Sequence, residues 1–405
     1  MARFKLIFPS EEALEAATAI ETAGVQDLLV NRKRRSVAVE LATPLAAPES
    51  FSALSARRHS PLGELAERFG AQIVEDYQYE LEPAPELMAD TEVHTESGAL
   101  DDVVKLIRAD KAHKHARGEC VTLAIVDTGV DGSHPEFAQN RRAGGWAPQG
   151  EDPWTDWQGH GTMCMTIAAA NGGKGSRYLG VAPEAKLISC RTSFFDSELT
   201  AIYDMLIERA RSGERIVASN SFGRRTGMPP PPPGPGSQFP DALDEAIQTG
   251  IAVVFSAGNN HELAGGAPQA CAPNSIWMYK SRADLLAVAT CDLDERMWFY
   301  SSRGPGQHYG QPGTNAKPDV TAPTPRNGRI LYGAREQVLE NGWGTSGACP
   351  QVAGLAALIW SRHSRMNAQQ VLDMIKNSAR DLGFAANCQG SGMIDCEKAL
   401  QHLAV

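Results

Sequence analysis

The segment Gly342-Trp343-Gly344-Thr345-Ser346-Gly347-Ala348-Cys349-Pro350 runs directly into the apolar stretch Val352-Ala353-Gly354-Leu355-Ala356-Ala357-Leu358-Ile359. The apolar stretch predicts a buried helix, and the small residues before it place Ser346 near the start of that helix. A helix N-terminus offers free N–H groups and a positive dipole end, both of which favour a developing oxyanion. Ser346 is therefore a candidate nucleophile, although most serines at such positions are simple helix caps.

The composition is that of an ordinary globular protein. The 405 residues are 42% hydrophobic and 21% charged, which suits one large domain and a smaller one. The net charge of −10 argues against a nucleic-acid partner. No stretch is long enough to span a membrane. The start of the sequence lacks the pattern of a signal peptide, so we expect a cytoplasmic protein, with export by another route left open.

The cysteines do not suggest a metal site or a disulfide scaffold. The sequence has eight of them and no Cys-x-x-Cys pair. Cys388 and Cys396 are close enough in sequence to be bridged, but free thiols are the expectation.

Residues 1–82 predict a compact α+β unit of their own. Strand and helix patterns follow one another in the order β-α-β-β-α-β, which is the split-βαβ, ferredoxin-like arrangement. Residues 83–100 are rich in proline and acidic residues and predict an exposed linker.

Residues 101–405 change to strands that alternate with helices, which predicts an α/β domain with a largely parallel sheet flanked by helices. In such sheets reactive groups gather at the carboxyl ends of the strands. Asp127 ends the apolar strand 121–126, and Asn259 follows the strand 251–255. His160 precedes a small, apolar helix in the same manner as Ser346. Each of these residues alone is more often a turn or cap residue.

Together, these residues occur in the order Asp, His, Ser, which is the subtilisin order among serine proteases. Over residues 101–402 the chain resembles the subtilisin family, the subtilases. The resemblance is carried by four motifs: Asp127-Thr128-Gly129, Gly159-His160-Gly161-Thr162, Ser256-Ala257-Gly258-Asn259 and Gly344-Thr345-Ser346.

The resemblance implies a serine endopeptidase that acts on protein or peptide substrates. In that family's mechanism Ser346 would attack the scissile carbonyl, His160 would take its proton, and Asp127 would orient the imidazole. Asn259 would donate its side-chain amide to the oxyanion. The resemblance also implies an extended substrate bound along two backbone segments, Ser221, Phe222, Gly223 and Ser256, Ala257, Gly258.

The N-terminal unit resembles, more loosely, the inhibitory propeptide of the family. It implies that residues 1–82 aid folding and act as an intramolecular inhibitor, so that the chain is made as a zymogen. Self-cleavage is then expected between Glu80 and Met88. The lack of a signal peptide suggests an intracellular processing role.

The chain departs from the family pattern at a few positions. Gly347 and Met163 stand where many relatives carry methionine and histidine, and both changes indicate altered packing beside the site. The loop 170–179 has no carboxylate, so a structural calcium ion is not supported by the sequence. No cofactor and no metal ligand set are expected.

Two alternatives remain at this point. One is a catalytically silent binding or adaptor protein that keeps the protease fold; a lipase or esterase is disfavoured, because the Gly-x-Ser-x-Gly elbow is missing. We expect the floor of the specificity pocket near Ser275–Tyr279. The loop 224–239, with its prolines Pro229–Pro233, is expected to overhang the cleft, where Arg224 and Arg225 would favour acidic residues upstream of the cut.

Overall fold

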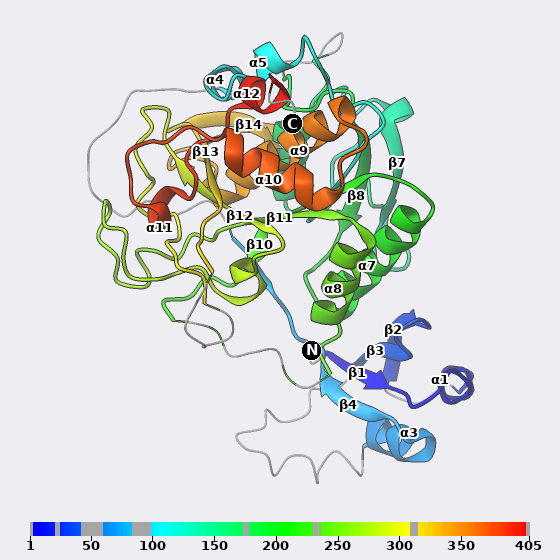
Figure 1. Cartoon of the computed structure of the whole chain (residues 1–405). Helices are drawn as coiled ribbons and strands as arrows, with labels where there is room; N and C mark the ends of the chain where they lie inside the picture. Colours follow the sequence, from blue (N-terminus) through cyan, green and yellow to red (C-terminus); the bar gives the residue numbers. More distant parts are fainter. Residues whose placement is uncertain are drawn as a thin grey trace.

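The computed structural model describes residues 3–20, 25–41, 60–82, 99–172, 178–228, 230, 234, 236–307 and 315–401. A small N-terminal sheet lies beside a large α/β body, and residues 76–82 lead from the first to the second (Figure 1).

The N-terminal part has the predicted order of elements. Its sheet has the order β2-β3-β1-β4, and every neighbouring pair of strands is antiparallel. Ser10 and Ser60 cap the two helices with their hydroxyls, as expected for helix starts. The elements are β1 (Arg3–Ile7), α1 (Glu11–Thr18), β2 (Val25–Asn31), β3 (Ser36–Leu41), α3 (Pro61–Phe69) and β4 (Gln72–Glu75).

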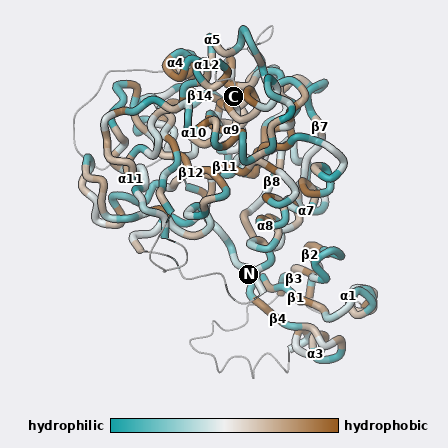
Figure 2. Tube along the Cα trace, viewed as in Figure 1, coloured by the Kyte–Doolittle hydropathy of each residue, from teal (hydrophilic) through white to brown (hydrophobic). Residues whose placement is uncertain are grey.

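The large body is built on a parallel sheet of seven strands, as the alternation of strands and helices predicts. Its order is β13-β12-β11-β9-β6-β8-β7. Most of its strands are buried throughout, which explains why they are continuous apolar runs (brown in Figure 2). The strands are β6 (Thr122–Asp127), β7 (Arg142–Trp146), β8 (Lys186–Arg191), β9 (Ile216–Asn220), β11 (Ala252–Ser256), β12 (Leu286–Cys291) and β13 (Val320–Pro323).

Helices cover both faces of this sheet and create two cores. Val254 packs on one side with α6 and α9, whereas its neighbours Val253 and Phe255 pack on the other side with α7 and α8. None of the helices in the described parts of the chain has the length and apolarity needed to cross a bilayer. The helices are α4 (Leu100–Leu106), α5 (Ala109–Ala112), α6 (His160–Ala169), α7 (Asp196–Arg211), α8 (Phe239–Thr249), α9 (Gly344–Arg362), α10 (Ala368–Ser378), α11 (Ala386–Gln389) and α12 (Cys396–Gln401).

Several short elements are not apparent from the sequence. An antiparallel hairpin, β14 (Gly328–Tyr332) and β15 (Arg335–Leu339), approaches the start of α6 through a bond from Gly333 N to Gly159 O (3.1 Å). The two-residue strands β5 (Glu80–Leu81) and β10 (Phe222–Gly223) pair with each other. Such strands are too short to give a hydrophobic period. Two short 3-10 helices, η1 (Gln139–Arg141) and η2 (Met278–Ser281), complete the described elements.

The expectation of free thiols throughout is wrong for one pair of cysteines. Cys271 and Cys388 form a disulfide with a Cα–Cα distance of 5.1 Å, although 117 residues separate them in sequence. The fold brings together two loops that no local pattern relates. The other six cysteines, among them Cys396, are free thiols.

The close contact between α9 and the loop after α6 gives a test of the packing. A Cβ added at Gly354 would lie 2.7 Å from Val181 Cβ and 3.1 Å from Ala168 O. We therefore expect Gly354→Ala to lower the free energy of unfolding by about 1–3 kcal/mol through overpacking. Thermal unfolding measures this loss. Gly234→Ala is the control, because a Cβ there meets none of the described atoms within 4 Å, and an equal loss in both variants would contradict the packing account.

Candidate active site

The carboxyl end of β6 and the start of α6 bring Asp127 and His160 together. His160 Nδ1 lies 2.8 Å from Asp127 Oδ1 and 3.0 Å from Oδ2. The backbone N–H of Thr128 also donates to Asp127 Oδ1 (2.8 Å). Both side chains are buried. The carboxylate thereby fixes the ring orientation and favours the tautomer that carries its proton on Nδ1.

Asp156, which sequence reasoning missed, holds the start of α6 in place. Its carboxylate accepts bonds from the backbone N–H groups of Gly159 (2.7 Å) and Thr162 (2.8 Å). It also accepts a bond from the hydroxyl of Thr128 (2.7 Å), which ties α6 to the end of β6. A carboxylate at a helix N-terminus satisfies free N–H groups and the helix dipole. The sequence signal that could have identified Asp156 is its position four residues before His160.

The surroundings of His160 change its basicity. Burial disfavours the charged imidazolium, but the attraction of Asp127, with smaller contributions from Asp156 and Glu82, outweighs it. The pKa of His160 is therefore raised above its ordinary value. Its other nitrogen, Nε2, is buried and has no hydrogen-bond partner in the described part of the chain.

The first turn of α9 presents Ser346, as predicted. Pro350 lies four residues further on and has no N–H to donate to the Ser346 carbonyl. That carbonyl instead accepts a bond from the hydroxyl of Ser221 (3.1 Å). The Ser346 hydroxyl donates to the backbone carbonyl of Glu82 (2.9 Å). The nucleophile candidate is thus in direct contact with a peptide carbonyl of its own chain.

Asn259 follows β11 and bonds to the same turn of α9. Its Oδ1 accepts bonds from the backbone N–H (3.0 Å) and hydroxyl (2.9 Å) of Thr345. These bonds orient the carboxamide, and a Cβ added at Gly344 would lie 2.9 Å from Asn259 Nδ2. The structure therefore places the predicted oxyanion residue beside the residue that precedes Ser346.

The segment Tyr77–Glu82 follows the N-terminal sheet and leads from it to Ser346. On one side it pairs with β10, with Leu81 opposite Phe222 and Glu80 opposite Gly223. On the other side, the N–H of Tyr79 donates to Phe194 O (2.9 Å). Of the predicted substrate-binding residues, Phe222 and Gly223 pair with this segment, and Ser221 contacts Ser346.

The second predicted substrate-binding segment lies at the Glu82 end of the segment Tyr77–Glu82. The hydroxyl of Ser256 lies 3.3 Å from Glu82 Oε2. The N–H of Ala257 donates to Val288 O (2.9 Å) and so holds the segment on β12. A Cβ added at Gly258 would lie 3.4 Å from Glu82 Oε1. The Glu82 carboxylate also forms an ion pair with Lys280, one residue beyond the predicted pocket floor.

Arg224 contacts the segment from the outside. Its guanidinium bonds to the hydroxyl of Tyr77 (2.7 Å) and lies 3.8 Å from the carboxylate of Glu80. Residues 229, 231–233 and 235 of the proline loop lie outside the described residues. The expected overhang of this loop above the active site therefore stays a prediction. Residues 83–98 of the expected linker also lie outside the described residues.

Asp127, His160 and Cys164 lie close enough together to hold a metal ion, with ligand atoms within 4.8 Å of one another. The donor chemistry does not fit one. The carboxylate is occupied by His160 and Thr128, and burial raises the pKa of the Cys164 thiol well above its ordinary value. A thiolate ligand is therefore disfavoured. Residues 173–177 of the possible calcium loop lie outside the described residues.

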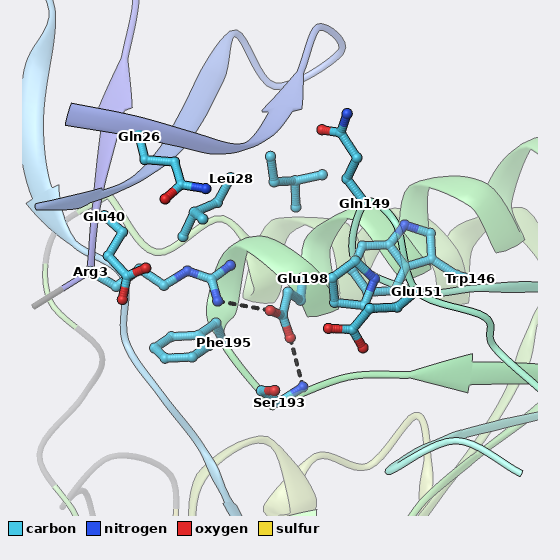
Figure 3. A pocket seen from close by; sticks show the side chains of 12 residues that line it. Arg3, Gln26, Leu28, Glu40, Trp146, Gln149, Glu151, Ser193, Phe195 and Glu198 are labelled. Carbon is cyan, nitrogen blue, oxygen red and sulfur yellow. Dashed lines mark hydrogen bonds and ion pairs between the residues drawn. The ribbon is translucent and has the colours of Figure 1, made fainter. Parts of the chain in front are cut away.

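A separate cavity of about 700 Å³ lies between the N-terminal sheet and the start of α7 (Figure 3). Arg3 crosses one side of it and pairs with Glu198 (2.8 Å). None of the residues lining it belongs to the Asp127, His160 and Ser346 group. It belongs to the contact between the two parts of the chain.

The described structure therefore has a buried Asp127–His160 pair and a Ser346 hydroxyl that donates to the Glu82 carbonyl and not to His160 Nε2. The model of the subtilase family matches residues 118–393. Subtilisin E of Bacillus subtilis (strain 168) is 31% identical over 304 residues, which cover 74% of this chain and 70% of the relative. An alkaline protease of Shouchella clausii is 30% identical over 325 residues, covering 79% and 75%. The chain belongs to the subtilase family and is a subtilisin-like serine peptidase.

Solved structures support the same fold. The crystal structure of MycP1 with its N-terminal propeptide removed matches with a TM-score of 0.58 at 22% identity, covering 75% of this chain and 98% of that one. MycP1 from the ESX-1 type VII secretion system matches with a TM-score of 0.56 at 20% identity, covering 81% and 92%. At these identities the likeness concerns the fold alone.

The Asp127–His160 pair gives a test that does not depend on catalysis. In Asp127→Asn the attraction that outweighs burial is lost, so we expect the pKa of His160 to fall below its wild-type value. NMR titration of the imidazole signals measures it, with the His160 signal assigned by its loss in His160→Ala. Asp131→Asn removes a carboxylate from the next loop and should leave the His160 titration unchanged. A His160 pKa that is the same in wild type and Asp127→Asn would contradict the electrostatic account.

Proposed function

We propose that this subtilase is an endopeptidase that hydrolyses peptide bonds through Asp127, His160 and Ser346 and is made as a self-inhibited zymogen. The observation that carries the proposal is the 2.9 Å bond from the Ser346 hydroxyl to the carbonyl of Glu82. In this proposal residues 1–82 are the inhibitory domain, residues 83–100 are the linker, and residues 101–405 are the catalytic domain. The segment Tyr77–Glu82 lies in the cleft as a substrate would.

The chemistry follows from the positions of the groups. Ser346 Oγ attacks the carbonyl carbon and passes its proton to His160 Nε2, and an acyl-enzyme forms when His160 returns that proton to the leaving nitrogen. Asp127 stabilises the imidazolium between these two transfers. Asn259 and the N–H of Ser346 stabilise the oxyanion. Every group in this scheme belongs to the protein, so the proposal includes no metal ion and no cofactor.

The N-terminal domain is well placed to inhibit in the same chain. Lys5 forms a fully buried ion pair with Asp196 at the start of α7. Asp76 accepts bonds from the N–H (2.9 Å) and hydroxyl (2.6 Å) of Ser197. The tether makes binding intramolecular, so even modest contacts keep the cleft filled. The intramolecular inhibitor and a protein or peptide substrate are the partners that we propose.

The place where the protein acts is a separate part of the proposal. A processing role, with cleavage at few sites, fits a cleft that contacts its occupant over several residues. The cytoplasmic location expected from the sequence has weaker support, because the Cys271–Cys388 disulfide is more typical of oxidising compartments. We therefore propose the processing role without a compartment.

The bond presented to Ser346 is Glu82–Pro83, which lies within the predicted cleavage region. Proline adds a ring to the leaving nitrogen and restricts the residue before it, so attack at this bond should be slow. We expect Pro83→Ala to increase the rate of self-cleavage after Glu82 by about 10-fold or more, an estimate of the size of one lost steric barrier. Intact-mass spectrometry of the purified full chain over time measures the rate.

The control for this experiment is Ser346→Ala in the Pro83→Ala chain, which should show no cleavage. If the Pro83→Ala chain that retains Ser346 is cleaved at another bond, the assignment of Glu82 as the residue presented to Ser346 is contradicted. If neither chain is cleaved and neither cuts a peptide, the endopeptidase proposal fails and the adaptor alternative is favoured.

A fluorophosphonate probe tests the nucleophile and its base together in the self-cleaved chain. We expect Ser346 to be labelled, and labelling to slow as the pH falls, because protonated His160 cannot accept a proton. Since the pKa of His160 is raised, the midpoint should lie above the ordinary value of about 6.5. Mass spectrometry of the labelled peptide gives the site and the rate. Labelling of His160→Ala at the wild-type rate would refute the role of the base.

A further inference from the structure

The side chain of Glu82 enters a closed pocket beside the nucleophile. Its relative exposure is 1%, and that of Lys280 is 3%. Glu82 Oε1 forms an ion pair with Lys280 Nζ. Glu82 Oε2 lies within reach of two hydroxyls, Ser256 Oγ at 3.3 Å and Thr345 Oγ1 at 3.4 Å. Because the Thr345 hydroxyl donates its proton to Asn259 Oδ1 (2.9 Å), the carboxylate has one cation and one hydroxyl donor, that of Ser256, around it.

The pocket has space for this carboxylate because two of the residues that line it, Gly223 and Gly258, have no side chain. A Cβ added at Gly223 would lie 2.5 Å from Glu82 Oε1 and 2.5 Å from Lys280 Nζ. A Cβ added at Gly258 would lie 3.4 Å from Glu82 Oε1. These glycines belong to the two segments that line the cleft. Any larger residue at Gly223 would occupy the position where the acid and the lysine meet.

Lys280 is held in place by the backbone around it. It lies in η2, where the hydroxyl of Ser281 donates to Met278 O (2.6 Å) and the side chain of Asn315 donates to Ser281 O (2.9 Å). Among the described residues, Glu82 is the only acid within ion-pair distance of the Lys280 ammonium. The lysine is therefore fixed in the pocket and is left without a counter-ion when Glu82 is absent.

The contact of Ser346 with the Glu82 carbonyl makes Glu82 the acyl residue, the residue on the carbonyl side of the scissile bond. We infer that Lys280 makes the enzyme selective for substrates with glutamate as the acyl residue. This inference rests on the proposed endopeptidase function and specifies its substrate class. Glutamine has the same shape but leaves the ammonium without a charge partner, and apolar residues would bury it unpaired. Lysine and arginine are repelled.

The contacts of the residues before Glu82 contribute less to the selection of substrates. The carboxylate of Glu80 is half-exposed and lies 3.8 Å from the half-exposed Arg224. Solvent-exposed ion pairs of this kind contribute little. Glu80 and Glu82 therefore provide two glutamates of the same segment, one on the surface and one desolvated, for a matched comparison.

The selectivity is measured first within the chain. In full-length protein with Pro83→Ala, we expect Glu82→Gln to slow self-cleavage on the order of 100-fold, as for loss of a desolvated charge pair. Glu80→Gln, the same change two residues earlier, should alter the rate less than about threefold. The charge exchange Glu82→Lys with Lys280→Glu should restore cleavage relative to either single change. Equal rates for Glu82→Gln and Glu80→Gln, or no rescue by the exchange, would overturn the inference.

The second measurement uses separate substrates and the self-cleaved full chain. Internally quenched peptides with the sequence Tyr-Glu-Leu-X-Ala differ only at X, which is Glu, Gln, Asp, Leu or Lys. We expect kcat/KM for Glu to exceed that for Gln by about 100-fold, and Lys280→Met to abolish this preference. Arg224→Met removes a cation near the same segment and should retain it.

The outcomes separate the two proposals. If the enzyme cuts the Leu peptide better than the Glu peptide, or if Lys280→Met keeps the wild-type order, the inference fails while the endopeptidase function stands. If no peptide is cut and Ser346 is not labelled by the fluorophosphonate, the function fails. In that case thermal unfolding still tests the ion pair. If Glu82 and Lys280 are paired, the variant that combines Glu82→Lys with Lys280→Glu should have a higher unfolding midpoint than either single variant.

Discussion

The burial of α9 between the parallel sheet and α6 is the constraint on which the site depends. This helix is closely packed along its length, and its glycines permit contacts that a Cβ would prevent, as at Gly354 against Val181. Because the helix cannot shift, its first turn fixes Ser346 relative to the ends of β6 and β11. Asp127 and Asn259 come from those strand ends, so the tight core positions groups that are far apart in sequence.

The same packing explains what the sequence could reveal. Most strands of the sheet are buried on both faces and are therefore visible as apolar runs, whereas β7 is only partly buried and is not. Each candidate site residue stands at the end of such a run or at the start of an apolar helix. The order of Asp127, His160 and Ser346 then related three individually weak signals. The β-α-β-β-α-β order of the N-terminal part was visible for a similar reason, since each of its elements has its own period and caps.

Features that depend on tertiary proximity could not be predicted in this way. The Cys271–Cys388 disulfide joins two loops with no common pattern. Lys280 lies next to the expected pocket floor, yet a lysine in sequence indicates a solvated surface far more often than a desolvated pocket. Only the approach of Glu82, 198 residues earlier, identifies its environment.

The segment between the two parts of the chain is held at both ends by a buried carboxylate. Asp76 caps the start of α7 at one end, and Glu82 meets Lys280 beside the nucleophile at the other, with strand pairing between them. Cutting the bond after Glu82 would leave both anchors in place, so the cut segment would dissociate reversibly and compete with substrate for the site. Release would require either dissociation of the whole N-terminal domain or its degradation. In the proposed zymogen one side chain would therefore have two roles, because Glu82 would block the enzyme and also occupy the pocket that we infer to select its substrate.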